Sequence, residues 1–258
     1  LPARHSGRAV LAVLATYWGG SAVMGRRAAF IGAGILATSA LFVFEAHIAK
    51  TDAMLCAMAA IVMASLLRQR QTPKPAQAII FWAAMGVGIM VKGPIIPVLV
   101  LLTLGGLFAW ERNAAWMKSL INWLGILLCA LIVIPWAVMI GLATDGAFFT
   151  DAFTGDLAPK LASGQESHGQ PPGFYLGTLP FLFWPGSLFL VCGLVLGIRA
   201  AQQTSDDNAG IASASRLLLV WIIPFWILLE IVPTKLPNYL LPAYPALALL
   251  CGGAVSAM

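Results

Sequence analysis

Long apolar stretches alternate with short polar connections along the whole chain, and this pattern predicts a bundle of membrane helices. Each stretch has roughly the 16–24 residues that a helix needs to cross the hydrocarbon core of a bilayer. The stretches lie at about 8–24, 28–47, 51–67, 76–91, 94–110, 119–142, 175–198, 215–232 and 238–257. We therefore predict an all-α, polytopic transmembrane bundle with about nine spans, in which the 76–110 region alternatively forms a re-entrant pair.

The composition agrees with an integral membrane protein. The 258-residue chain is 60% hydrophobic and 10% charged, with a mean hydropathy of +0.89, and these values exclude an ordinary soluble domain. Four cysteines lie inside apolar stretches, without the spacing of a metal site or a redox pair. We predict that they are small buried apolar residues rather than disulfide partners.

Basic residues gather at alternate connections between the apolar stretches. They are Arg26, Arg27, Arg68, Arg70, Lys74, Arg112, Lys118, Arg199 and Arg216. The positive-inside rule makes these connections cytoplasmic, which predicts a multi-pass protein of a bacterial cytoplasmic (inner) membrane. The net charge of +5 is explained by this topology, so no nucleic-acid partner is predicted.

The opposite, extracytoplasmic connections hold most of the unusual polar residues. They comprise the segment 45–52, Lys92 with Gly93 and Pro94, the loop 143–174 and the segment 234–245. A loop of this length is longer than a connector requires, and long loops are usually functional or disordered. Residues 150–161 within it have the pattern of a short amphipathic surface helix. The gathering of polar residues on one face predicts a functional site there.

Three groups on this face each allow a structural and a functional interpretation. Asp52 follows Thr51 at a predicted helix start. In the structural interpretation Thr51 caps the helix and the helix dipole stabilises Asp52 in the first turn. In the functional interpretation the Asp52 carboxylate faces a polar cavity. Lys92 either extends to the headgroups or binds an anion beside Gly93 and Pro94. The segment around Lys235, Asn238 and Tyr239 is either an interfacial turn or a second anion site.

His168 lies in the long loop between Glu166 and Gln170. A loop histidine is commonly solvated, and no second histidine stands at the spacing of a strong metal motif. Glu45 and His47 are two residues apart and so do not share a helix face. The chain contains no Walker loop and no GxGxxG, GxSxG or HExxH motif, so ATP-driven transport and the common soluble hydrolase mechanisms have no support.

Six local patterns, in order along the chain, resemble the bacterial GT-C membrane glycosyltransferases that take a sugar from a polyprenyl-phosphate carrier. Lipid A aminoarabinose transferases and the protein O-mannosyltransferase-like family are the most similar groups. The patterns are Gly25-Arg26-Arg27-Ala28-Ala29, Ala49-Lys50-Thr51-Asp52-Ala53, Val91-Lys92-Gly93-Pro94, Pro135-Trp136, His168-Gly169-Gln170-Pro171 with Phe174-Tyr175, and Lys235-Leu236-Pro237-Asn238-Tyr239-Leu240-Leu241-Pro242. Each pattern is weak alone, and together they indicate the superfamily without specifying a substrate.

The resemblance implies one GT-C-type domain over residues 1–258, with an extracytoplasmic loop at 143–174. It also implies that an N-terminal helix, the first extracytoplasmic loop and a C-terminal part lie outside this chain. The principal catalytic carboxylate of the family is expected in that first loop, which leaves Asp52 as the second, catalytic carboxylate of this chain.

The implied reaction transfers a sugar from polyprenyl phosphate to a hydroxyl or phosphate of a lipid A, glycan or protein acceptor. Lys92 and Lys235 would stabilise the leaving phosphate, since a charged leaving group needs cations more than an acid. Asn238 and Tyr239 would hydrogen-bond the phosphate or the sugar. His168, Gln170 and Tyr175 would bind substrate from the covering loop, which closes to exclude water. The only cofactor considered is a divalent metal, with His168 as its ligand.

Two alternatives from other classes remain open on the sequence. A transporter or flippase for a lipid-linked or anionic substrate explains the intramembrane lysines and acids equally well. Against it, the polar residues gather at one interface rather than at the midplane, and no repeat relates two halves. In the other alternative, a structural membrane subunit, the same residues serve only as anchors.

Overall fold

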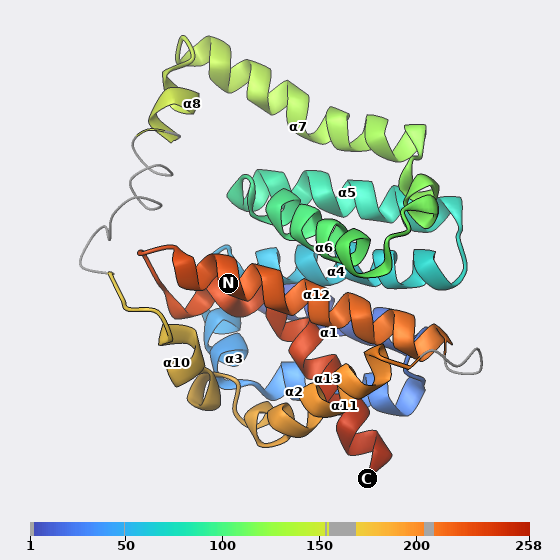
Figure 1. Ribbon diagram of the computed structural model, residues 1–258. Helices are drawn as coiled ribbons and strands as arrows, with labels where there is room; N and C mark the ends of the chain where they lie inside the picture. The colour runs from blue at the N-terminus through green and yellow to red at the C-terminus, as the bar shows by residue number, and fades with distance from the viewer. Residues whose placement is uncertain (1–2, 49, 153, 155–168, 204–208) are drawn as a thin grey trace.

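The computed structural model describes residues 3–48, 50–152, 154, 169–203 and 209–258, and within these ranges it contains helices and no β-strand (Figure 1). The elements are α1 (Ala3–Ser21), α2 (Arg26–Thr38), α3 (Ala40–His47), α4 (Asp52–Gln71), α5 (Pro75–Lys92), α6 (Ile95–Glu111), η1 (Ala115–Leu120), α7 (Trp123–Ala143), α8 (Ala147–Asp151), α10 (Phe174–Leu182), η3 (Gly186–Phe189), α11 (Leu190–Ala201), α12 (Ala209–Ile231), η5 (Pro237–Ala243) and α13 (Tyr244–Ala257). The predicted all-α bundle is confirmed.

Every predicted apolar stretch is helical, but fewer than nine helices are long and apolar enough to span a membrane. In the described residues, five qualify: α4, α5, α7, α12 and Pro237–Ala257. The number rises to seven if two bent pairs are each one span: α2 with α3, bent by 59°, and α10 with Gly186–Ala201, bent by 114°. The apolar helix α6 has only 17 residues. The count of nine therefore overestimates the clear spans.

Helix α4 forms the centre of the bundle. It contacts α1, α5, α6, α13 and η5, and 83% of its apolar window is buried. The cause lies in its sequence, because Ala, Met, Leu and Cys cover all sides of the segment 53–67. A helix that is apolar all round belongs in the interior of a protein or a membrane. Asp52, its first residue, is thereby held against its neighbours.

Helices α2 and α13 pack backbone against backbone. A Cβ added at Gly32 would lie 2.9 Å from the carbonyl oxygen of Ala248, and one added at Gly252 would lie 2.8 Å from Cα of Gly32. Small residues permit such close approach, which is the usual basis of helix association in membranes.

Helix α7 lies along α5 at the edge of the bundle (Figure 1). It approaches α5 where glycines leave room, at Gly86 against Cys129 and at Gly125 against Ile79. None of its apolar window is buried, although its sequence is the most apolar of the spans. An exposed apolar face of this kind matches the hydrocarbon of a bilayer.

The bundle has two chemically different ends. We call them the Asp52 end, where α4 begins and α3, α5 and α12 finish, and the Arg70 end, where α4, α6 and α11 finish. In Figure 1 the bundle lies on its side, with α10 near the left-hand Asp52 end and the α6–α7 connection at the right. The basic residues named above as cytoplasmic all belong to the Arg70 end.

Candidate active site at the Asp52 end

Asp52 and Lys92 form the centre of the candidate site. The Nζ of Lys92 donates to Oδ1 of Asp52 over 2.5 Å, with 5% of the Asp52 side chain and 30% of the Lys92 side chain exposed. The pair joins the first residue of α4 to the last residue of α5. Coulombic attraction is stronger at such a partly dry position than in water. The buried acid therefore fixes the ammonium of a lysine whose side chain is partly exposed.

Tyr239 adds a third chain segment to this pair. The ammonium of Lys92 lies 5.5 Å from the centre of the Tyr239 ring, a cation–π distance. Tyr239 belongs to η5, which begins at Pro237 and carries the buried Asn238. The structure thus brings together Asp52, Lys92 and Tyr239, which the sequence separates widely and which were predicted only to share one face of the membrane.

Glu45 contributes a second buried carboxylate at the same end. Its side chain is 3% exposed, and its Oε2 has no hydrogen-bond partner among the described residues. Asp52, Lys50 and Lys92 are close enough to interact with its charge. An unsatisfied buried carboxylate is costly, so a site that retains one calls for an external donor. The helical spacing argument gave Glu45 little weight, because it could not show that α3 turns this residue inward.

Lys235 differs from the prediction in its contacts. It is 3% exposed, and its Nζ donates to the carbonyl oxygens of Gln170, at 3.0 Å, and Val232, at 2.8 Å. The amide of Gln170 donates in turn to Pro233, and Gly169 pairs with Thr234 in an isolated antiparallel bridge. Lys235 thus ties the end of the long loop to the α12–η5 connection.

Glu230 was not anticipated, although a single carboxylate inside the apolar stretch 215–232 was the available signal. Its Oε2 accepts from the amide of Gly173 at 2.8 Å, and its Oε1 accepts from the amide of Tyr175 and the indole of Trp226, both at 3.2 Å. An acid at the first amides of a helix is favoured by unpaired N–H groups and by the helix dipole. Glu230 therefore positions α10 and the wholly buried Tyr175.

The remaining predictions for this end concern the Thr51 cap, Gln170, His168 and the surface helix 150–161. Helix α4 begins at Asp52 with Thr51 at its N-cap position, but the Thr51 side chain makes no capping hydrogen bond, so that part of the capping interpretation is wrong. Gln170 is exposed and acts through its backbone. His168 lies outside the described residues, as do residues 153 and 155–161 of the predicted surface helix 150–161.

The described residues do not form a metal site by themselves. Outside the undescribed segments, no cluster of three His, Cys, Asp or Glu side chains has the arrangement of a metal site. The divalent metal proposed for His168 stays a prediction.

Comparison with known proteins shows consistent similarity. A family model described as dolichyl-phosphate-mannose-protein mannosyltransferase matches residues 8–139. An undecaprenyl phosphate-alpha-4-amino-4-deoxy-L-arabinose arabinosyl transferase from Pseudomonas fluorescens is 28% identical over 183 residues, which cover 67% of this chain and 30% of the relative. A transferase of the same description from Erwinia tasmaniensis is 25% identical over 253 residues, covering 93% of this chain and 42% of the relative.

Solved structures share the fold. ArnT from Cupriavidus metallidurans bound to undecaprenyl phosphate superposes with a TM-score of 0.84 at 22% identity, covering 97% of this chain and 45% of the other. The apo structure of the same protein superposes with a TM-score of 0.83 at 21% identity, covering 100% of this chain and 45% of the other. The chain thus spans less than half the length of these relatives and structures.

Proposed function

Because the chain belongs to the family described as dolichyl-phosphate-mannose-protein mannosyltransferase, we propose that the protein is a glycosyltransferase that takes its sugar from a polyprenyl phosphate. The acceptor is a hydroxyl or phosphate of a lipid, glycan or protein at the extracytoplasmic face. The observation that carries this proposal is the meeting of Asp52, Lys92 and Tyr239 at one end of the bundle. The relatives named for undecaprenyl-phosphate sugars support the same donor class.

In the proposed reaction, the acceptor oxygen attacks the anomeric carbon while the bond from that carbon to the phosphate oxygen breaks. Polyprenyl phosphate leaves with the bonding electrons, and the acceptor proton passes to a carboxylate. Lys92 stabilises the charge that grows on the leaving phosphate, because the ammonium of this partly exposed side chain is held in a partly dry position. Asp52 orients Lys92, and the Tyr239 ring limits where the ammonium moves.

We further propose that the donor sugar carries an amine. Glu45 is buried beside the Asp52–Lys92 pair and keeps an oxygen without a donor in the described part of the chain. A sugar ammonium would supply that donor and compensate the second negative charge. The amino sugar in the names of the relatives fits this chemistry.

The test uses the full-length protein in detergent with a radiolabelled polyprenyl-phosphate sugar. Lys92→Met is expected to reduce transfer by about a hundredfold, the usual effect of removing one group that stabilises transition-state charge. Lys118→Met is the matched control, since Lys118 is an exposed lysine at the Arg70 end, remote from Glu45 and from the Asp52–Lys92–Tyr239 cluster. Equal transfer in the two variants would overturn the assignment. Donor binding without transfer to any acceptor would favour the transporter instead.

A further inference from the structure

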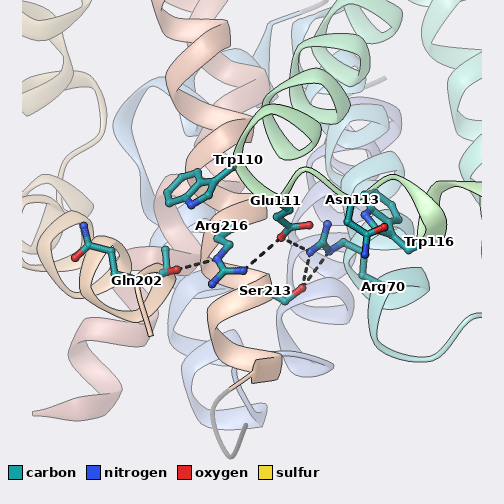
Figure 2. A pocket seen from close by; sticks show the side chains of 9 residues that line it. Arg70, Trp110, Glu111, Asn113, Trp116, Gln202, Ser213 and Arg216 are labelled. Carbon is teal, nitrogen blue, oxygen red and sulfur yellow. Dashed lines mark hydrogen bonds and ion pairs between the residues drawn. The ribbon is translucent and has the colours of Figure 1, made fainter. Parts of the chain in front are cut away.

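A second polar site lies at the Arg70 end, remote from the candidate active site. It is a cavity of about 650 Å³ among the ends of α4, α6, α11 and α12 and the turn η1 (Figure 2). Its lining residues are Arg70, Trp110, Glu111, Asn113, Trp116, Ala201, Gln202, Ser213 and Arg216. The proposed glycosyl transfer uses none of them.

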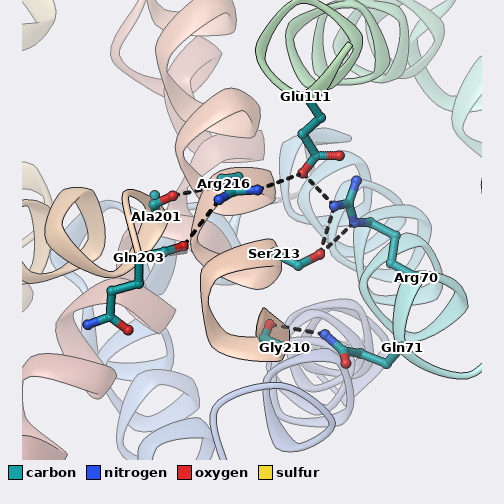
Figure 3. Close-up of polar contacts among 8 residues, drawn as sticks. All are labelled: Arg70, Gln71, Glu111, Ala201, Gln203, Gly210, Ser213 and Arg216. Carbon is teal, nitrogen blue, oxygen red and sulfur yellow. Dashed lines mark hydrogen bonds and ion pairs between the residues drawn. The ribbon is translucent and has the colours of Figure 1, made fainter. Parts of the chain in front are cut away.

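An ion-pair network joins three of the residues that line this cavity, Arg70, Glu111 and Arg216 (Figure 3). Arg70 binds Glu111 at 2.7 Å and the Ser213 hydroxyl at 2.7 and 3.1 Å. Arg216 lies 3.8 Å from the same carboxylate and donates to the carbonyl oxygens of Ala201, at 2.8 Å, and Gln203, at 3.3 Å. Two guanidinium groups therefore face one carboxylate, and the cavity keeps an excess positive charge.

Two buried donors in this cavity have no acceptor among the described residues. The Arg70 side chain is 7% exposed, and its Nη1 has no hydrogen-bond partner in the part of the chain that the structure describes. The indole Nε1 of Trp116 is also buried and has no acceptor among the described residues. The Arg70 guanidinium lies 4.5 Å from the centre of the Trp116 ring. In Figure 2 the Arg70 guanidinium points into the space between Glu111, Ser213 and Asn113. Buried unpaired donors of this kind require an explanation.

We propose that this cavity binds the phosphate group of an anionic ligand. A phosphate supplies several strong acceptors to guanidinium and indole donors and balances the excess charge. The Arg70 end is the cytoplasmic end by the positive-inside rule, where basic pockets between membrane helices bind lipid headgroups. Trp110 is 44% exposed at the rim, as is common for tryptophan at headgroup level. The source is a lipid headgroup or a soluble phosphate ester.

The test measures binding to the delipidated full-length protein by native mass spectrometry. Phosphatidylglycerol is titrated against phosphatidylcholine with the same acyl chains, and inorganic phosphate is then added as a competitor. We expect phosphatidylglycerol to bind more tightly. Displacement by millimolar phosphate identifies a soluble phosphate ester as the natural source, and retention of the lipid identifies the headgroup.

Gln202→Glu provides the decisive variant, because Gln202 is an exposed lining residue whose replacement adds one negative charge without disturbing the network. We expect it to weaken phosphatidylglycerol binding about tenfold, the order expected for one like charge beside an anion. Gln203→Glu makes the same change one residue later, outside the lining, and is expected to have little effect. Arg216→Gln should weaken binding as well, although it also removes contacts to Ala201 and Gln203.

Equal effects of Gln202→Glu and Gln203→Glu would show only general surface electrostatics and would overturn the proposal. Equal binding of phosphatidylglycerol and phosphatidylcholine, together with no binding of inorganic phosphate, would also overturn it. Sugar transfer is measured on the same samples. Because this cavity lies at the opposite end of the bundle, the result for the phosphate site does not depend on the proposed glycosyltransferase activity.

Discussion

At the scale of single residues, the buried carboxylate of Glu45 has the most unusual environment of the candidate site. Its Oε2 lacks a donor among the described residues, and Asp52 adds a second negative charge nearby. Removing an unsatisfied buried charge commonly leaves stability unchanged or raises it. A residue retained under these conditions is expected to serve a ligand.

The first prediction concerns Glu45→Gln. We expect unfolding of the full-length protein to occur at an equal or higher temperature, while transfer from an amino-sugar donor falls about tenfold or more, the value of one charge-assisted hydrogen bond. Transfer from a donor with a neutral sugar should change little. Thermal unfolding and transfer assays measure the two effects, and a loss of stability with unchanged transfer would give Glu45 a purely structural role.

The second prediction treats Asp52 and Lys92 as one unit. Asp52→Asn removes the counter-charge that holds the Lys92 ammonium, so we expect transfer to fall about a hundredfold, as for Lys92→Met. The double variant should lose little more than either single variant, because contacting residues are not additive. The ratio of kcat to KM in all four proteins gives the coupling. Independent, multiplicative losses would separate the two residues functionally.

The sequence was sufficient to place Asp52, Lys92 and Tyr239 at one interface, because topology puts all three there, but it did not predict the contacts among them. It was not sufficient for Lys235 or Glu230, whose roles depend on partners. A buried lysine binds an anion or backbone carbonyls equally well, and only the fold shows that Gln170 and Val232 provide the latter. Glu230 stabilises the start of α10 across 57 residues of sequence, a separation that local patterns do not bridge.

At the scale of secondary-structure elements, the contact between α2 and α13 has the least free space. A Cβ at Gly252 meets the backbone of α2, at Gly32 and Ala28, whereas a Cβ at Gly253 meets only the flexible end of Met24. Backbone atoms cannot move aside as a methionine methyl group can. Two adjacent glycines of one helix therefore differ in their tolerance of a side chain.

The third prediction follows from that difference. Gly252→Ala is expected to destabilise the protein by about 1–3 kcal/mol through overpacking. Gly253→Ala is expected to be neutral or to stabilise by up to about 1 kcal/mol, because alanine is the better helix former. Thermal unfolding of both variants in the same detergent compares them. Equal shifts would mean that α2 and α13 separate easily.

Helix breaks were harder to predict than helices. The stretches 28–47 and 175–198 are continuously apolar, yet each is bent, into α2 with α3 and into α10 with η3 and α11. The first break lies at Ser39, and there the amide of Ala40 donates to the carbonyl oxygen of Trp184 in the second bent pair. The two bends stabilise each other through a tertiary contact. Hydropathy measures the length of an apolar stretch and contains no information about such a partner.

At the scale of the whole molecule, one charge asymmetry organises both sites. Arginines dominate the Arg70 end, where they form a cavity with excess positive charge. Lysines and acids dominate the Asp52 end, where Asp52 pairs with Lys92 and Glu45 adds a second carboxylate beside them. The same distribution that orients the bundle by the positive-inside rule therefore separates the proposed chemistry from the proposed phosphate site.

The fourth prediction tests this orientation directly. All four cysteines are free, and Cys56 and Cys251 are buried, so a variant with alanine at the four positions provides the background for single-cysteine labelling. Lys50→Cys and Lys118→Cys place exposed thiols at the Asp52 end and the Arg70 end, respectively. In cells with a permeabilised outer membrane, a membrane-impermeant maleimide should label position 50 and not position 118, because the Arg70 end faces the cytoplasm. Disruption of the inner membrane should make both positions reactive. The reverse pattern would place the Asp52–Lys92 pair on the cytoplasmic side, where the proposed extracytoplasmic transfer cannot occur.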